Sequence, residues 1–225
     1  MNKEKMTIHR ALAELKTIDD RIKKAISETK FCRSNKHSNE KINGKSINDY
    51  IAETKSAYES INDLIRRRNA MKRAVVLSNA VTNVTVGDEV MTVAEAIEMK
   101  QKGINNIKLL MGKLAKDSHM ALEDCDIHNG ANLEARANEY VTGLFGAKDG
   151  KTNVEAIDAA KKMFIAANTY DFIDPLGAND VANKLYDYVR IFEADVDAAL
   201  SVSNAITTIE FEYQLVKNFG GFRNP

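Results

Sequence analysis

The sequence predicts a mainly α protein, a bundle of long helices with a small antiparallel β-sheet formed by a hairpin and a C-terminal strand. The 225 residues include only two prolines, so few positions interrupt a helix. Apolar residues recur at spacings of three and four over long stretches, as on one face of an amphipathic helix. The segment Ser78 to Val84 returns 125 positions later at residues 203–209, and each copy joins a helical pattern to an alternating one.

The first helix is expected to follow a capping threonine, Thr7. We expect Phe31 and Cys32 to end it, because residues 33–46 are polar and rich in turn-forming residues. Its apolar stripe consists of Ile8, Ala11, Leu15, Ile18, Ile22 and Ala25.

The second helix is expected to run from Ile47 to Leu77, a rod of about 45 Å at 1.5 Å per residue. Ser46 is its expected N-cap, and Asp49 adds negative charge near the positive end of the helix dipole.

Residues 84–92 predict a hairpin with a glycine at its turn. Thr92 then caps a third long helix, and Glu95, three residues later, completes a capping box. Gly103 and Gly112 cost this helix about 1 kcal/mol each relative to alanine, so we expect close helix packing at both positions.

The helical pattern shortens after residues 129–130 into two smaller helices, the second capped by Thr152. We therefore place a domain division there. Residues 1–128 are expected to form long antiparallel helices with a β-hairpin at 82–92. Residues 129–225 are expected to form a smaller helical part that ends in the helix-to-strand repeat and packs on the first.

The last helix is expected from about Asp180 to Val202, after a turn at residues 174–177 with the sequence Asp-Pro-Leu-Gly. It leads into a segment, residues 206–213, whose apolar and acidic side chains alternate as in a half-exposed strand.

The repeat has a structural interpretation. Ser and Asn near a helix end can hydrogen-bond free backbone groups, so we expect Asn79 and Asn204 at the C-terminal ends of their helices. An isolated hairpin is marginal in water, so we expect residues 82–86 and 207–212 to share one small sheet. A functional interpretation also stands, in which the paired Asn and Thr side chains line a pocket.

The 32 basic and 32 acidic residues are unevenly distributed. Residues 1–77 hold 18 Lys and Arg against 10 Asp and Glu, a net charge of +8, and residues 78–225 hold 14 against 22, a net charge of −8. The asymmetry predicts mutual neutralisation when the halves pack, or else a basic surface for an anionic ligand or complementary faces that join subunits.

Two cysteines argue against a disulfide framework. No run of about 18 apolar residues predicts a membrane span, and residues 1–10 lack the apolar core of a signal peptide. The expected location is therefore the cytoplasm of a host cell or a virion assembled there.

One face of the second helix is a candidate anion site. Arg66, Asn69 and Arg73 share it at i, i+3, i+7 spacing, and arginines hold phosphate through bidentate contacts. A salt-bridged helix face is the structural alternative. The repeat supplies further candidate ligand-binding side chains, namely Asn79, Thr82, Asn204 and Thr207.

No motif predicts catalysis, a metal or a cofactor. Residues 146–152 resemble a phosphate loop, but their glycines are one residue too close and a helical pattern precedes them. Cys125 and His128 have the spacing of a zinc ligand pair, but Cys32 and His37 are five residues apart, which does not favour a zinc site. No orienting residue accompanies a Cys/His nucleophile pair. Duplex DNA binding is not expected either, since no recognition motif or net basic charge is present.

Three stretches, residues 58–70, 78–82 and 92–97, resemble the septicolysin-like family of uncharacterised bacterial and phage proteins. The resemblance covers about the first 115 residues and implies long helices with a hairpin between two of them. It implies no activity, but it favours a phage or prophage origin and an oligomer.

Two functions follow as hypotheses. The first is a non-catalytic phage-type protein that acts by oligomeric assembly or binding, with copies of itself, phage structural proteins or a host protein as partners. The alternative is a small-molecule binding protein that sequesters a phosphorylated or nucleotide-type signal, an anionic ligand for the candidate residues above. An enzyme is not expected.

Overall fold

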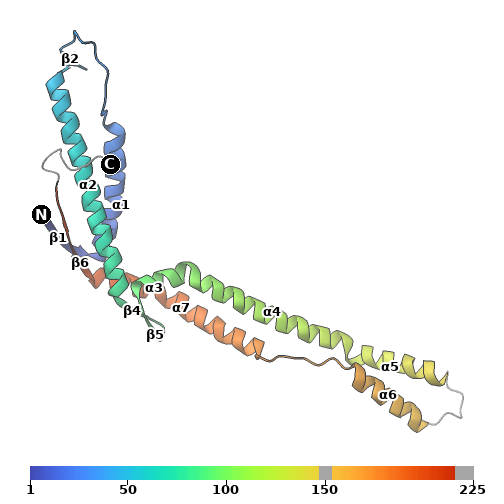
Figure 1. Cartoon of the computed structure of the whole chain (residues 1–225). Helices are drawn as coiled ribbons and strands as arrows, with labels where there is room; N and C mark the ends of the chain where they lie inside the picture. Colours follow the sequence, from blue (N-terminus) through green and yellow to red (C-terminus); the bar gives the residue numbers. More distant parts are fainter. Residues whose placement is uncertain (147–153, 216–225) are drawn as a thin grey trace, which may run out of the picture. The chain divides into compact units, whose positions relative to one another are not determined.

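The computed structural model describes residues 1–146 and 154–215, and it confirms the predicted class of long helices with small antiparallel sheets (Figure 1). The elements in chain order are β1 (Asn2–Thr7), α1 (Ile8–Glu28), β2 (Lys41–Ile42), β3 (Lys45–Ser46), α2 (Ile47–Val81), β4 (Asn83–Val86), β5 (Glu89–Thr92), α3 (Val93–Glu98), a π-helical turn (Met99–Gly103), α4 (Ile104–His128), α5 (Gly130–Phe145), α6 (Val154–Asn168), α7 (Ala178–Ile206) and β6 (Thr208–Tyr213).

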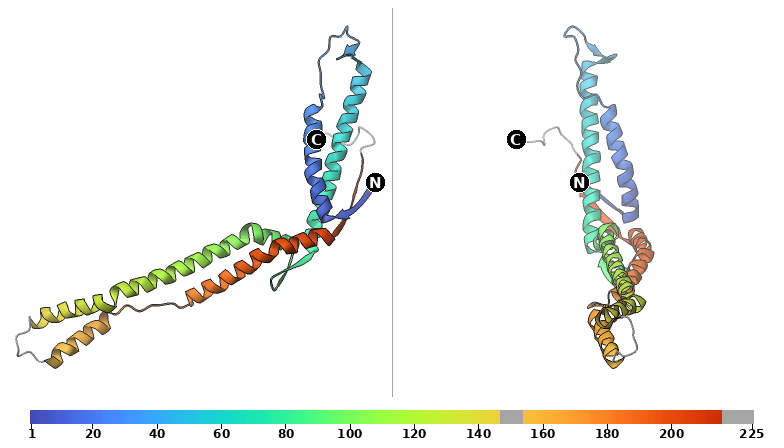
Figure 2. Two further views of the ribbon diagram at one scale, coloured as in Figure 1. Left: turned by 180° about the vertical axis from the view of Figure 1, so that it is seen from behind. Right: turned by 90° about the vertical axis from the view of Figure 1, so that its right-hand side faces the viewer.

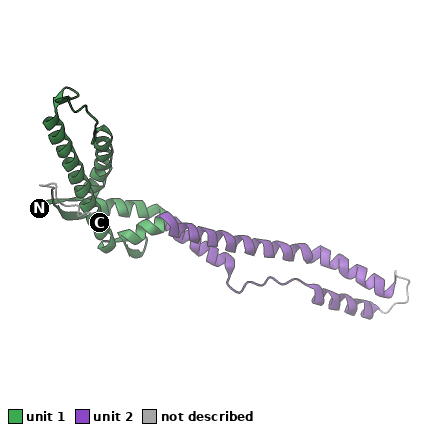
Figure 3. Cartoon of the chain, turned by 45° about the horizontal axis from the view of Figure 1, so that its top comes forward, with its two compact units in different colours: residues 1–100, 192–225 green, residues 101–191 purple. Residues whose placement is uncertain are grey.

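The chain divides into two compact units (Figure 3). Unit 1 comprises residues 1–100 and 192–225, and unit 2 comprises residues 101–191. The division expected from the sequence lay after residue 128. The observed one differs because β6, late in the chain, pairs with β1 and so joins the last part of α7 to the first unit.

The predicted helix starts are confirmed. The side chains of Thr7, Ser46 and Thr92 each accept a hydrogen bond from the backbone N–H three residues later, at 3.1–3.3 Å. The Glu95 carboxylate accepts from the backbone N–H of Thr92 at 2.7 Å, which completes the predicted capping box.

Three helix ends differ from the predicted ones, and one of them is the end of α7, which lies at Ile206 rather than at Val202. Helix α1 ends at Glu28 rather than at Phe31 and Cys32, because Thr29 turns to extended backbone and its hydroxyl donates to the carbonyl of Ala25 at 2.7 Å. Helix α2 continues to Val81, four residues beyond the predicted end, so that its last turn carries the repeat.

Other sequence predictions had mixed outcomes. The turn at residues 174–177 is confirmed, since the Asp174 carboxylate accepts from two following backbone N–H groups and Gly177 has a φ of 64°. The close packing expected at Gly112 is wrong, because a Cβ there would meet nothing within 4 Å. Thr152 and most of residues 146–152 lie outside the described residues.

The shared sheet predicted for residues 82–86 and 207–212 is wrong. Strand β4 pairs only with β5 in its two-stranded sheet, and β6 pairs antiparallel with β1, from Asn2 opposite Tyr213 to Thr7 opposite Thr208. Strand β1 was not predicted, because Met6 is its one buried side chain and two lysines and a glutamate precede Met6. Such a strand shows no apolar alternation.

The expected position of the repeat asparagines is confirmed. Asn79 lies two residues before the end of α2, and Asn204 two residues before the end of α7. In both copies the following threonine closes the helix: the Thr82 N–H donates to the Ser78 carbonyl, and the Thr207 N–H to the Ser203 carbonyl, both at 2.9 Å.

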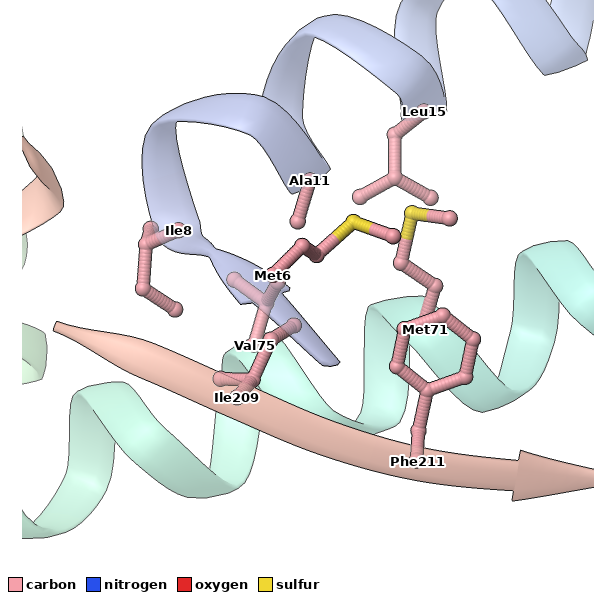
Figure 4. Close-up of a cluster of buried hydrophobic side chains, with 8 residues drawn as sticks. All are labelled: Met6, Ile8, Ala11, Leu15, Met71, Val75, Ile209 and Phe211. Carbon is pink, nitrogen blue, oxygen red and sulfur yellow. The ribbon is translucent and has the colours of Figure 1, made fainter. Parts of the chain in front are cut away.

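A hydrophobic cluster holds α1 and α2 against the β1·β6 pair (Figure 4). Helices α1 and α2 lie side by side (Figure 2), and the Phe211 ring reaches from β6 across to Met71 on α2. The buried members of the cluster are Met6, Ile8, Ala11, Leu15, Met71, Val75, Ile209 and Phe211.

The structure reveals a second internal repeat. Residues 6–12 and 91–97 share the order Met-Thr-β-branched residue, then alanine and a branched apolar residue at the helix start. The first N–H of each following helix donates to the threonine that closes the opposite helix: Ile8 to Thr207 at 2.9 Å, and Val93 to Thr82 at 2.8 Å. The chain therefore repeats one order of elements, a strand, then helices, then a closing strand, in residues 2–86 and 89–213. Each strand pair joins a strand of the first repeat half to a strand of the second.

Core positions agree with this duplication. Seven of the eight cluster residues have an apolar counterpart at the corresponding position of the other repeat half, namely Met91, Val93, Ala96, Val196, Leu200, Val84 and Val86. The exception is Leu15, whose counterpart is Lys100, and Lys100 forms an ion pair with Asp197.

We predict that Phe211→Ala lowers the free energy of unfolding by about 3–5 kcal/mol, because it removes a buried ring between β6 and α2. Urea unfolding followed by circular dichroism measures the change. Val90→Ala on exposed β5 is the control and should change stability by less than about 0.5 kcal/mol. Equal small effects of both substitutions would contradict the observed packing of β6.

Candidate functional site

The predicted anion site on α2 lies at the surface. Arg66, Asn69 and Arg73 are all exposed, and Arg73 lines a groove beside β6. Arg67 and Arg68, which lie between Arg66 and Asn69 and are not among the predicted ligand residues, have carboxylate partners instead.

Arg67 joins α2 to β1 and α1. Its Nε and Nη2 donate to the two carboxylate oxygens of Glu4 at 2.7 and 2.6 Å, and Nη2 also donates to Glu14 at 2.5 Å. The Tyr213 hydroxyl donates to the same Glu4 carboxylate at 2.7 Å, which adds β6. This bidentate arrangement is the strong form of an Arg–carboxylate contact.

The network shifts the pKa of each member. Hydrogen bonds from Arg67 lower the pKa of Glu4 and of Glu14, and burial opposes both shifts. The Glu4 carboxylate raises the pKa of Arg67. Burial, and then the bond to Glu4, raises the pKa of the Tyr213 phenol. All four groups thus stay in their ordinary charge states at neutral pH.

The neighbouring arginine has a partner as well. Arg68 Nε donates to Asp19 on α1 at 2.9 Å, and this bond lowers the pKa of Asp19. Arg67 and Arg68 are therefore neutralised by carboxylates of residues 1–77, rather than by the acidic part of the chain.

A groove beside β4, which we call the β4 groove, contains two of the predicted ligand residues, Thr82 and Thr207. Its volume is about 460 Å³, and its lining comes from residues 82–85 and 87 and from the last part of α7. Asp195 is the charged residue of this lining. A carboxylate without a neighbouring cation repels anions, so this groove does not favour a phosphate.

A second groove, the β6 groove, corresponds to the first. It has a volume of about 450 Å³ and lies between α2 and β6. Nine of its ten lining residues, shifted by 125 positions, line the β4 groove. The charges differ: Arg73, Glu210 and Glu212 stand where the β4 groove has Ala198, Thr85 and Gly87.

The seven predicted ligand residues are thus distributed over several places. Thr82 and Thr207 share the β4 groove, Arg73 lies in the β6 groove, and the others lie outside both linings: Arg66, Asn69, Asn79 and Asn204.

A third hollow, of about 600 Å³, lies between α1 and α2 and includes Arg10, Arg21 and Arg67. Arg10 and Arg67 both bind Glu14, at 3.2 and 2.5 Å. Within the described chain Arg21 alone among the three has no carboxylate partner, so the hollow offers one free positive charge.

The cysteines and histidines do not form a catalytic arrangement in the described residues. Cys32 is exposed, and Cys125 is half-buried on α4. The His128 ring stacks on Tyr170 with centroids 4.3 Å apart, and its Nδ1 lies 2.8 Å from the Asp124 carbonyl. In the described ranges, no three His, Cys, Asp or Glu side chains lie close enough together to hold a metal ion.

The helices of unit 2 present apolar side chains to solvent. In α4, only Ile104 and Ser118 are buried along 25 residues, and none of the described residues of α6 is buried. Leu109 on α4 and Met163 on α6 are 73% and 74% exposed. No helix in the described ranges has the length and apolar character needed to cross a membrane.

Comparison of the chain with family models, curated proteins and solved structures finds no match.

We predict that Arg67→Met lowers stability at pH 7 by about 1–3 kcal/mol, because Glu4 and Glu14 then lose the guanidinium that they share. The carboxylate pKa values are lowered in the native protein. Their contribution is therefore present above the unfolded value near 4.5 and is lost as the pH falls through the native values.

The variant should lack this acid-dependent loss, and its stability should rise on acidification from pH 7 toward 5. Urea unfolding across pH 3–7 measures both curves. Arg66→Met, on the exposed face of the same helix, is the matched control and should follow the native curve. Identical pH curves for Arg67→Met and the native protein would refute the role of the network.

Proposed function

We propose that the chain is a non-catalytic protein of phage type that acts by oligomeric assembly. The observation that carries the proposal is the near absence of buried residues along the described parts of α4 and α6. Both helices are amphipathic, and such helices normally bury their apolar stripe against another element.

The exposed side chains on α4 are numerous. Five large apolar residues on this helix are more than two-fifths exposed: Leu109, Leu110, Met120, Leu122 and Ile127. Scattered exposed apolar residues are common on monomers, but Leu109, Met120 and Ile127, spaced by eleven and seven residues, lie on one side of the helix, as on an interaction surface. Helices of this kind associate with other helices along their apolar seams.

The proposed partners are copies of this chain, with phage structural proteins or a host protein as further partners. The resemblance of residues 58–70, 78–82 and 92–97 to septicolysin-like proteins favours a phage origin, and with it a location in the host cytoplasm or a virion.

The alternative, sequestration of an anionic small molecule, gains little from the geometry. The β4 groove contains Asp195, and the β6 groove contains two glutamates beside Arg73. In the third hollow, Arg10 and Arg67 are both paired with Glu14. A nucleotide that raises the melting temperature would revive it, since a ligand that binds only the native state must stabilise that state.

Assembly predicts a native mass that is a multiple of the chain mass of 25.0 kDa. Multi-angle light scattering at micromolar concentration measures it, because scattered intensity reports mass independently of shape. Dilution should lower the average mass by mass action. A mass of 25.0 kDa at every concentration tested would contradict assembly with copies of the chain.

A further inference from the structure

Helix α2 extends beyond the helix that covers it. Helix α1 has 21 residues and α2 has 35. Ile8 at the start of α1 and Val75 on α2 belong to one core cluster. At 1.5 Å per residue, the end of α1 is therefore level with about residue 55 of α2. Residues 47–54 lie past that end, where α2 continues alone beside a loop (Figures 1 and 2).

This uncovered part of α2 is apolar on one side. Ile47 and Ile51, one turn apart, are 38% and 43% exposed, and Phe31 from the loop is similarly exposed. Phe31 lies edge-on to Tyr58, with centroids 6.5 Å apart. With Thr54 and Lys55, these two rings line a hollow of about 350 Å³. We call Phe31, Ile47, Ile51 and this hollow the tip surface.

The tip surface has a fixed backbone beside it and a positive rim. The Tyr50 hydroxyl donates to the Lys30 carbonyl at 2.8 Å and ties the loop to α2. Residues 29–42 contain four cations, Lys30, Arg33, Lys36 and Lys41, and one carboxylate. Within the described chain none of the four cations has an ion-pair partner, in contrast to Arg67 and Arg68.

The last three turns of α4 have the complementary character. From Asp117 to His128 the helix contains four acidic residues and neither lysine nor arginine. Met120 and Ile127 lie seven residues apart on one face, and each is more than half exposed. Glu123 and Asp124 stand between them on the same face, which we call the α4 face.

We propose that the tip surface of one chain binds the α4 face of a second copy. This inference rests on the proposed assembly and names its contact. Ile47, Ile51 and Phe31 would lie against Met120 and Ile127, and the basic rim would face the α4 carboxylates. Opposite charges at the rim of an apolar contact select the partner and its orientation. The contact joins two different surfaces, so each chain has one of each and the assembly grows head to tail.

A mixing experiment tests this contact. The tip variant is Ile47→Ser with Ile51→Ser, and the α4 variant is Met120→Ser with Ile127→Ser. All four side chains are exposed, so the fold should survive, and circular dichroism verifies it. Val76→Ser, at an exposed position of α2 away from the tip, is the matched control.

Light scattering should give the native mass for the control and 25.0 kDa for each variant alone. An equimolar mixture of the two variants should give twice 25.0 kDa and no more, because one intact tip surface then meets one intact α4 face. Added salt should dissociate this dimer, since the rim charges are solvent-exposed.

Three results would overturn the proposal. If both variants assemble like the native protein, assembly uses other surfaces and only this inference fails. If the variants are monomeric but do not combine on mixing, the two surfaces do not bind each other. If the native chain is itself monomeric, the proposed function fails together with this inference. A contact between the tip surface and the α4 face of the same chain would also give a monomer and would have the same consequence.

Discussion

Unit 1 depends on the antiparallel pairing of β1 with β6, two strands about two hundred residues apart in sequence. Without it, Met6, Ile209 and Phe211 would lose their places in the cluster that joins α1 to α2. Arg67 reinforces the same junction from α2, because its guanidinium binds Glu4 on β1 and Glu4 in turn accepts from Tyr213 on β6. The long sequence separation makes this closure entropically costly, and burial of the cluster together with the charge-assisted bonds offsets that cost.

The duplication explains why the chain uses the same junction twice. In the β4·β5 pair a short hairpin joins the strands, whereas in the β1·β6 pair the connection is nearly the whole chain. The backbone bonds at the threonines are nevertheless the same, and so are the positions that line the two grooves. The β4 groove and the β6 groove thus share a backbone framework but differ in their side chains. Any function that is specific to one groove depends on the charges that differ between them.

The helices and their caps could be predicted from the sequence, whereas a short polar strand could not. Helix caps at Thr7, Ser46 and Thr92 follow from local hydrogen bonding, so the sequence predicted them correctly. Strand β1 could not be predicted, because an edge strand with one buried side chain has no apolar periodicity. The sequence signal for β1 is the Met-Thr segment shared by residues 6–12 and 91–97, which in its second copy belongs to the predicted hairpin.

The candidate site shows the same limit. Spacing placed Arg66, Asn69 and Arg73 on one helix face, which is correct, but spacing cannot reveal which arginine has a carboxylate within reach. That depends on the packing of α1 and β1 against α2, which places Glu4 and Glu14 opposite Arg67. Thr82 and Thr207 do share a groove, because the two junctions that contain them are brought together in unit 1.

The charge asymmetry of the chain now separates into parts with different consequences. Near the strand pair it is satisfied internally: Lys5 and Lys3 lie 3.0 and 3.3 Å from Glu210, and Arg67 and Arg68 on α2 have carboxylate partners. At the tip surface the cations have no such partners within the described chain. A net charge of zero leaves no long-range repulsion between copies, so local complementarity can govern their association.

In the proposed assembly, the duplication gives the contact between copies a direction. The helices of residues 2–86 form one arm of the duplicated chain, and the helices of residues 89–213 form the other. The tip surface belongs to the first arm, and the α4 face belongs to the second. If the two arms had remained alike, like surfaces would meet and close a symmetric pair. Because the first arm is basic at its uncovered end and the second is acidic in the last three turns of α4, the proposed contact is between unlike arms. Contacts between unlike arms leave one free surface at each end, and growth then stops only by ring closure or by a different partner that occupies a free end.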